Sequence, residues 1–298
     1  MISVKDLKKD FGDYTALEGL TCNIERGSIY GLVGYNGSGK TTLLKTLSGI
    51  YKADAGKVLV DGENIYDNEQ AKRRMFFVPD DLYFTFQANM KSMARFYKGY
   101  YPRWSDKTFN SLTEIFVLDK NKRINGFSKG MQRQAAIILA LSTSPDYLLL
   151  DESFDGLDPV KRSLVKQLLT EVMAEKEMGI IISSHNLREL EDLCDRIGII
   201  NNKHIVNDCS LDELRASKNK YRLAFAVDIS EELLLDIEYT NYSKSGKVIT
   251  FISTGDSQVI KDKLDKLNPV LFEILPLTLE EIFLNEMGVQ EYDFTGTF

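Results

Sequence analysis

Residues 34–41 read Gly-Tyr-Asn-Gly-Ser-Gly-Lys-Thr and fit the pattern G-x-x-x-x-G-K-[ST]. The apolar run Ile29–Val33 before them predicts a short buried strand, and the apolar residues from Leu43 to Ile50 recur at helical spacing. A chance glycine turn is the alternative, but it would not explain why a strand precedes the pattern and a helix follows it. The sequence therefore predicts a phosphate-binding loop.

The chemistry of this loop follows from its residue types. Glycines let successive backbone N–H groups turn inward toward phosphate oxygens, and the start of the helix adds a positive dipole. Lys40 places a positive charge near the β and γ phosphates, and the Thr41 hydroxyl is a candidate ligand for Mg²⁺. We expect the nucleotide to contact Gly34, Tyr35, Asn36, Gly37, Ser38, Gly39, Lys40, Thr41 and Thr42.

Two carboxylates and a histidine end later strands. Asp151 and Glu152 follow the apolar run Tyr147–Leu150, and His185 follows a strand predicted at 180–182. Beside a phosphate loop, Asp151 is placed to hold Mg²⁺, Glu152 to polarise the attacking water and His185 to contact the γ-phosphate. The alternatives are a solvated acidic pair and an ordinary loop histidine.

Strands and helices alternate through the first two thirds of the chain. Asp158 and Pro159 predict the start of an amphipathic helix, and Gly179 predicts its C-cap. Residues 75–78 predict a further strand, which Pro79 ends. This alternation predicts an α/β domain with a largely parallel sheet.

The pattern changes near residue 218, after a polar stretch. Strands are predicted at 221–227, 247–252 and 270–274, and the capping box of Thr278 and Glu281 predicts a last helix that stops near Gly288. We therefore expect residues 219–298 to form a small α+β accessory domain.

Composition narrows the class of protein. The chain has 298 residues and a net charge of −7, which argues against a basic nucleic-acid-binding surface. Its three cysteines have no metal-like spacing, and no apolar run is long enough to span a bilayer. We expect a cytoplasmic protein, and any work at a membrane would need another polypeptide to cross it.

Residues 127–132, Phe-Ser-Lys-Gly-Met-Gln, resemble the L-S-G-G-Q signature of the ATP-binding cassette (ABC) ATPases. Ser128 and Gly130 match the family's serine and second glycine, whereas Phe127, Lys129 and Met131 replace its leucine, first glycine and glutamine. Similar S-K-G-M forms occur in the family's drug- and peptide-efflux branches. The resemblance covers roughly residues 1–218 and implies a P-loop NTPase cassette with a helical subdomain at about 82–143. A helix capped by Ser128 is a second interpretation, compatible with the first.

The resemblance also implies how two copies would share ATP. In this family two cassettes pair head to tail, so Ser128, Lys129, Gly130 and Met131 would meet ATP held by the partner's P-loop. Residues 155–158 match the D-loop, with Asp155 and Asp158 at that interface, and Phe11 occupies the place of an aromatic that stacks on adenine. The cofactors implied are ATP and Mg²⁺.

One residue departs from the family pattern. The family's Q-loop glutamine follows the strand that ends here at Val78-Pro79, and this chain has Asp80 instead. A carboxylate suits Mg²⁺, so Asp80 is a further candidate metal ligand. It also brings a second negative charge toward the metal.

The implied partners are a second cassette, in a homodimer or heterodimer, and separate transmembrane permease subunits that would hold the chain at the inner face of the membrane. Residues 96–104 are rich in aromatic side chains and would either meet the permease or form the core of the helical subdomain. An exporter ATPase is the main hypothesis. The alternatives are an ABC ATPase acting on ribosomes or DNA and a small-molecule kinase, but no nucleic-acid partner is expected.

Overall fold

The computed structural model describes residues 1–216, 218–227, 237–255 and 257–287. The chain divides into two compact units, Met1–Asp208 and Cys209–Phe298. This division lies ten residues before the expected boundary at 218. Helix α8 (Leu211–Ala216) packs against helix α10 (Leu279–Glu286), which places it with the second unit.

The main sheet of the first unit has six strands, in the order β10-β9-β3-β8-β7-β6. Pairing is parallel between β6 and β7, β7 and β8, β8 and β3, and β3 and β9, which confirms the expected sheet. Strands β3, β7 and β8 are buried at every residue, as continuous apolar runs in parallel sheets are. The bounds are β3 Ile29–Val33, β6 Met75–Val78, β7 Tyr147–Asp151, β8 Gly179–Ser183, β9 Arg196–Asn201 and β10 His204–Ser210.

A second, antiparallel sheet in the first unit was not foreseen from the sequence. Its order is β2-β1-β4-β5, with bounds β1 Ile2–Phe11, β2 Tyr14–Ile24, β4 Ala55–Val60 and β5 Glu63–Asn64. One core cluster joins the two sheets: it contains Leu17 of β2, Leu149 of β7, and Leu43 and Leu44 of helix α1 (Lys40–Leu47). The helix that follows the glycine-rich loop is thus held between the sheets.

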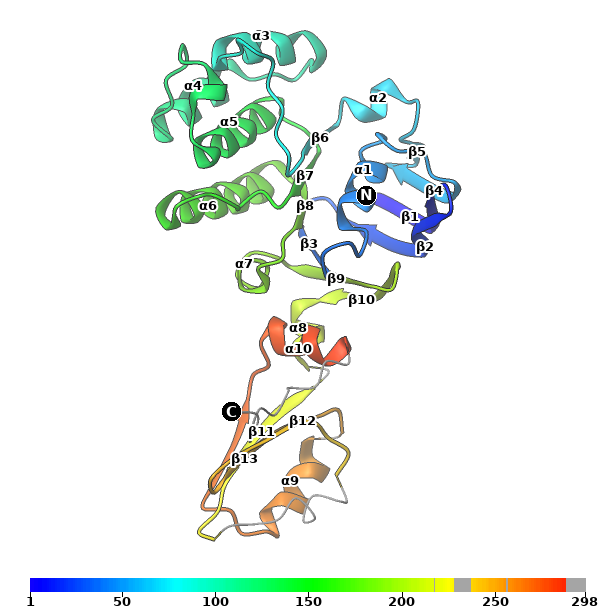
Figure 1. The fold of residues 1–298 in the computed structure, drawn as a ribbon, viewed down its shortest axis with the longest axis vertical. Helices are drawn as coiled ribbons and strands as arrows, with labels where there is room; N and C mark the ends of the chain where they lie inside the picture. Colours follow the sequence, from blue (N-terminus) through cyan, green and yellow to red (C-terminus); the bar gives the residue numbers. More distant parts are fainter. Residues whose placement is uncertain (217, 228–236, 256, 288–298) are drawn as a thin grey trace. The chain divides into compact units, whose positions relative to one another are not determined.

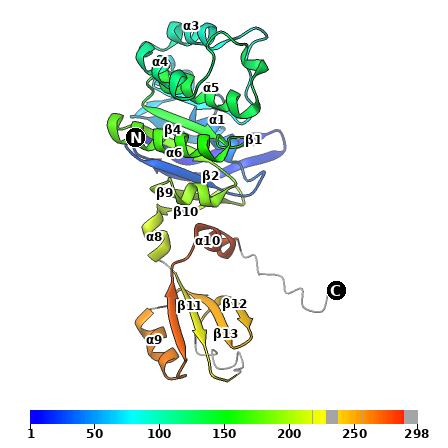
Figure 2. The ribbon, with the colours of Figure 1, turned by 90° about the vertical axis from the view of Figure 1, so that its left-hand side faces the viewer.

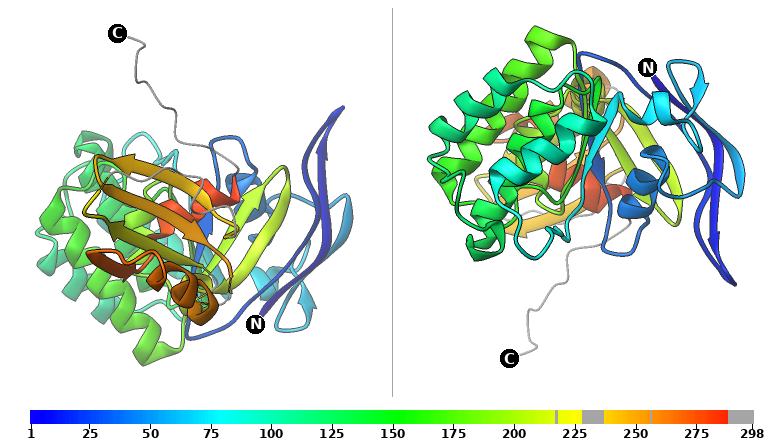
Figure 3. Two further views of the ribbon diagram at one scale, coloured as in Figure 1. Left: turned by 90° about the horizontal axis from the view of Figure 1, so that it is seen from below. Right: turned by 90° about the horizontal axis from the view of Figure 1, so that it is seen from above.

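Helices α3 (Met90–Tyr100), α4 (Asp106–Ile115) and α5 (Lys129–Ser142) gather into one group, which lies in the range expected for the helical subdomain (Figure 1 and Figure 3, right). Helix α5 packs against both other helices and against β6, and most of its residues are buried. The shorter helices are α2 (Glu69–Lys72), the 3₁₀ turn Ile124–Gly126 and α7 (Leu187–Glu191).

The start of helix α6 (Pro159–Lys176) is confirmed, but its predicted C-cap is wrong. Glu177, with φ 49°, takes the left-handed conformation at the end of the helix, and Gly179 is the first residue of β8. A Cβ on Gly179 would lie 2.9 Å from the carbonyl oxygen of Glu25 and 2.8 Å from the Tyr147 ring. The glycine therefore serves close packing of the strand, and the helix ends without it.

The second unit is built on an antiparallel sheet in the order β12-β13-β11-β14, with helix α9 (Ser257–Asp265) packed on it (Figure 2). The strand order is that of ferredoxin-like sheets. Tyr221, Leu223 and Phe251 form its core with Ile260 and Leu264 of α9. The bounds are β11 Asn219–Ala224, β12 Thr240–Ser245, β13 Val248–Ser253 and β14 Leu271–Leu275.

The capping box that begins helix α10 is confirmed. The Thr278 hydroxyl accepts the backbone N–H of Glu281, and the Glu281 carboxylate accepts the backbone N–H of Thr278. Gly288, where this helix was expected to stop, lies outside the described residues.

Candidate nucleotide site

The glycine-rich loop turns into helix α1 at Gly39, whose φ is 106°. A Cβ on this residue would lie 2.7 Å from the Leu17 side chain and 2.9 Å from the carbonyl oxygen of Ala16. Both the backbone conformation and the close approach to β2 therefore require glycine. The start of α1 is fixed directly behind the loop, with its first N–H groups facing the loop.

Lys40 is a buried cation that no carboxylate pairs with directly. Its side chain is 7% exposed, and Nζ donates to the carbonyl oxygens of Gly34 at 2.7 Å and Tyr35 at 3.2 Å. In the part of the chain that the structure describes, no salt bridge includes it. Burial lowers the pKa of the Lys40 ammonium, while Glu152 and Asp151 act in the opposite direction. A buried ammonium with neutral partners attracts an anion such as a phosphate.

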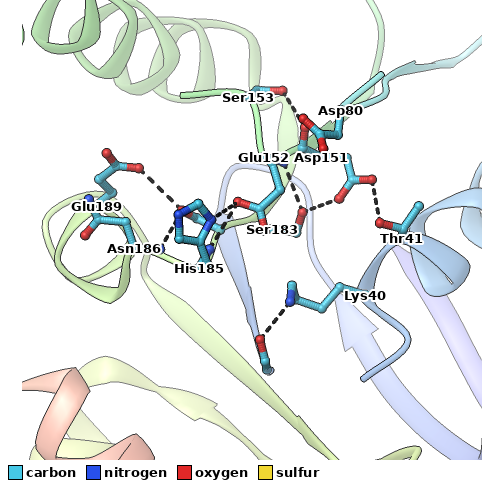
Figure 4. Close-up of polar contacts among 12 residues, drawn as sticks. Lys40, Thr41, Asp80, Asp151, Glu152, Ser153, Ser183, His185, Asn186 and Glu189 are labelled. Atoms are coloured by element: carbon cyan, nitrogen blue, oxygen red, sulfur yellow. Dashed lines mark hydrogen bonds and ion pairs between the residues drawn. The ribbon is translucent and has the colours of Figure 1, made fainter. Parts of the chain in front are cut away.

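The end of β7 presents a row of oxygen ligands to the start of α1. Thr41 Oγ1 donates to Asp151 Oδ2 at 2.8 Å, and Ser183 Oγ donates to Asp151 Oδ1 at 2.5 Å (Figure 4). Asp151 is 1% exposed, so these two hydroxyls fix its orientation. Hydroxyl and carboxylate oxygens are the ligands that Mg²⁺ takes in proteins, so this donor set fits that ion. Ser183 is a site residue that the sequence reasoning missed.

Glu152 points away from Asp151 because its backbone is left-handed, with φ 46°. Its Oε2 lies 2.9 Å from Nδ1 of His185 and accepts the His185 backbone N–H at 3.1 Å (Figure 4). The hydrogen bond with Glu152 raises the pKa of His185 above its ordinary value. A carboxylate oxygen of Asp155 lies within 4.8 Å of the Glu152 carboxylate and of the His185 ring nitrogen. The structure thus brings Glu152 and His185, two of the three expected catalytic residues with Lys40, into direct contact.

A cavity of about 340 Å³ is lined by Glu152 and by residues of the glycine-rich loop, but not by Asp151 or His185. Phe11 lies on its edge, 43% exposed and packed edge-on against Tyr51 at 5.2 Å between ring centroids. Tyr14, which the sequence reasoning missed, provides a second aromatic. This nucleotide cavity is lined by Phe11, Tyr14, Ala16, Asn36, Gly37, Gly39, Lys40, Thr41, Thr42, Asp80 and Glu152.

Three residues of the predicted loop lie outside this lining. Gly34 and Tyr35 contribute carbonyl oxygens to Lys40. Ser38 has a buried hydroxyl without a hydrogen-bond partner, and its Oγ would lie 2.4 Å from a Cβ on Gly34. These three residues support the conformation of the loop, and the absence of a side chain at Gly34 leaves room for the Ser38 hydroxyl.

Of the four predicted signature residues, Lys129 lines a different cavity, of about 550 Å³, whereas Ser128, Gly130 and Met131 are not part of its lining. Ser128 caps α5 by accepting the backbone N–H of Met131 at 3.3 Å, and Asp158 caps α6 through Lys161 in the same way. This signature cavity is lined by Asp80, Asp81, Leu82, Lys129, Gln132, Arg133, Asp155 and Gly156. The structure therefore does not bring the signature and the P-loop together on one cavity.

Asp80 lines both cavities and is held by a residue that the sequence reasoning missed. Arg133 of α5 donates through Nη2 to Asp80 Oδ1 at 2.9 Å and to the Asp80 carbonyl oxygen at 3.0 Å. Its Nη1 donates to the carbonyl oxygen of Pro79 at 2.7 Å. Asp80 is thus the one expected metal ligand that carries its own cationic partner among the described residues.

A glycine-rich loop that holds a buried lysine, beside a parallel sheet that ends in carboxylates, is the site of a P-loop nucleotide-binding protein. The sequence model of a family described as ABC transporter matches residues 17–155. The chain is 31% identical to the ABC transporter ATP-binding protein YtrB of Bacillus subtilis, over 97% of this chain and 98% of that protein. It is 29% identical to the bacitracin transport ATP-binding protein BcrA of Bacillus licheniformis, over 97% and 96%.

Among solved structures, an ATP-binding subunit of an ABC transporter superposes with a TM-score of 0.68 at 27% identity, covering 72% of this chain and 92% of that one. The chain belongs to the ABC transporter ATP-binding proteins, which confirms the resemblance drawn from residues 127–132. It binds ATP and hydrolyses it to energise transport. Within the described ranges, every helix is too short or too polar to span a bilayer.

Proposed function

We propose that this chain energises export, as one of a pair of cassettes that drive separate transmembrane permease subunits from the inner face of the cell membrane. The observation that carries the proposal is the separation of the P-loop and the signature onto two cavities. A second copy or a related cassette would place its signature over this P-loop and complete the site. Relatives named for bacitracin transport and Nod factor export support an efflux role.

Each site residue has one task in this proposal. Lys40 binds the phosphates, and Thr41 and Asp151 would hold Mg²⁺, which would supply charge neutralisation at the phosphates. Glu152 accepts the proton of the attacking water, and His185 orients Glu152 through their 2.9 Å contact. Ser183 keeps the Asp151 carboxylate turned toward Thr41.

The helical subdomain offers a surface for the permease. A groove of about 300 Å³ between α2 and α3 exposes Phe96 and Tyr100, by 54% and 59%. Tyr97 and Tyr101 instead pack on Phe76 at 5.2 and 5.5 Å. The aromatic segment therefore serves the core on one side of α3, and we assign its exposed side to the permease.

Two substitutions test the assignment of the site. Lys40→Ala removes the buried cation and should weaken ATP binding about 10- to 100-fold, the range for losing a charged hydrogen bond. Glu152→Gln keeps the shape of the base but cannot take a proton, so it should bind ATP, dimerise and hydrolyse about 100- to 10,000-fold more slowly.

The controls carry the same chemical changes at exposed sites, Lys107→Ala on α4 and Glu175→Gln on α6. ATP affinity would be measured with a fluorescent nucleotide, dimerisation by light scattering and turnover by phosphate release. Near-normal turnover of the Glu152 variant would remove that residue from its role. A Lys40 variant that binds ATP like the parent would refute the nucleotide site itself.

A further inference from the structure

The segment after β6 is fastened to the helix that carries the signature. Arg133, one turn into α5, is 6% exposed and gives three hydrogen bonds to two consecutive residues, Pro79 and Asp80. Two of the bonds reach backbone carbonyls and the third reaches the Asp80 carboxylate. The planar fork of a guanidinium can make this pattern, whereas a lysine ammonium cannot span it.

The charge of Asp80 matters because of where it lies. Glu152 already lines the nucleotide cavity, and Asp151, the last residue of β7, precedes it directly. A third, uncompensated carboxylate would repel the phosphates of ATP and attract a divalent cation. Arg133 supplies the opposite charge 2.9 Å from Asp80 Oδ1. It reaches Asp80 from the signature cavity, whose lining includes Arg133 and Asp80 but not Lys40.

We propose that Arg133 is a positioning residue that holds Asp80 at the metal side of the nucleotide cavity and compensates its charge, so that aspartate works where the family has glutamine. The proposal rests on the nucleotide site proposed above. It assigns to the pair a specific effect: Arg133 sets how strongly nucleotide binding depends on Mg²⁺. Through the same pair, Asp80 in the lining of the nucleotide cavity is connected to α5, the helix that carries the signature.

Removing the charge of Arg133 and removing the charge of Asp80 should have opposite effects on nucleotide binding, and this opposition tests the proposal. Arg133→Gln leaves the Asp80 charge uncompensated, so ATP should bind about three- to tenfold more weakly without metal, and the Mg²⁺ midpoint for tight binding should fall. Asp80→Asn should move both quantities the other way. In the double variant both charges are gone, and both quantities should return to within about twofold of the parent.

The measurement is the equilibrium binding of a fluorescent ATP analogue, in EDTA and across a Mg²⁺ titration, with no turnover needed. Arg133→Lys keeps the charge but loses the fork of hydrogen bonds, so its Mg²⁺ midpoint should lie between those of the parent and of Arg133→Gln, and it keeps the test valid if the glutamine variant does not fold. Arg95→Gln removes the same charge from an exposed position on α3 and should change neither quantity.

The outcomes separate the two proposals. Shifts of the same sign in the Arg133→Gln and Asp80→Asn variants, or a double variant that keeps the full shift of Arg133→Gln, would overturn the pairing while the parent still binds Mg-ATP. A parent chain that bound no nucleotide would overturn the proposed function, and the role of Arg133 with it.

Discussion

Gly130, in the first turn of the signature helix, lies against the loop of Asp155 more closely than any side chain would allow. A Cβ built on Gly130 would be 2.4 Å from the carbonyl oxygen of Gly156, whereas ordinary contacts begin at 3.4 Å. Gly130→Ala therefore requires the helix and the loop to separate by about 1.0 Å, the difference between these two distances. The neighbouring atom is backbone, so no side chain can rotate away.

The loss in free energy of unfolding follows from the size of this backbone shift. Extra carbon forced into a packed contact destabilises by about 1–3 kcal/mol when backbone must move. The first unit has the 208 residues Met1–Asp208. For a unit of this size 1 kcal/mol lowers the melting temperature by about 2–4 °C, so we expect a fall of about 2–12 °C.

Trp104 makes the measurement local. It is the only tryptophan of the chain, and it lies between α3 and α4, where Nε1 donates to Asp106 at 2.8 Å. Its fluorescence therefore reports unfolding of the helical group separately from the second unit. Gly99→Ala is the matched control: a Cβ there meets nothing within 4 Å, and alanine in a helix should stabilise by about 0.5–1 kcal/mol.

The two glycine variants should move the Trp104 transition in opposite directions. Equal or absent shifts would show that Gly130 does not pack on Gly156 as described. The reasoning would then fail for the contact between the signature and the D-loop.

Two further predictions concern titration and thiol reactivity. In proton NMR the pKa of His185 should lie above 6.5, and in Glu152→Gln it should fall toward 6.5. Because the pKa is raised in the folded chain, the stability that this contact contributes is present below pH 6.5 and is lost as the pH rises through the raised value. A pKa for His185 at or below 6.5 in the parent would contradict the contact, and His204→Gln assigns the signals. Burial raises the pKa of Cys22 to about 12 and that of Cys194 further, so a thiol reagent at pH 8 should modify at most the half-buried Cys209 until urea is added. Rapid reaction of two or more thiols in the folded chain would contradict this burial.

The elements predicted best from the sequence are those whose signals are local. The strand Ile29–Val33, the helix start at Lys40 and the caps at Asp158 and Thr278 each depend on residues within one or two turns. The prediction at Gly179 failed because a glycine after a helix resembles a C-cap, whereas this one makes room for Glu25, far away in the sequence.

The site divides in the same way. Lys40, Asp151 and Glu152 were predicted from short motifs at strand ends, and the structure places Lys40 and Glu152 on one cavity, with Asp151 bonded to Thr41 beside it. Ser183 and Arg133 were missed because each acts on a residue of another element, 32 and 53 positions away. Serine and arginine in those positions carry no motif, so only the fold could reveal what they hold.

The charges of the nucleotide site explain why metal and nucleotide should bind together. In the proposed mechanism Lys40 is the cation near two carboxylates, Glu152 and Asp151, and Arg133 compensates the third, Asp80. An ATP polyanion added to this set meets net repulsion unless a divalent cation arrives with it. An aspartate in the place of the family's glutamine would deepen that repulsion, and a buried arginine on the signature helix prevents it. The substitution at Asp80 is therefore best understood as one half of a pair, and the other half lies on the helix that the partner's ATP is expected to contact.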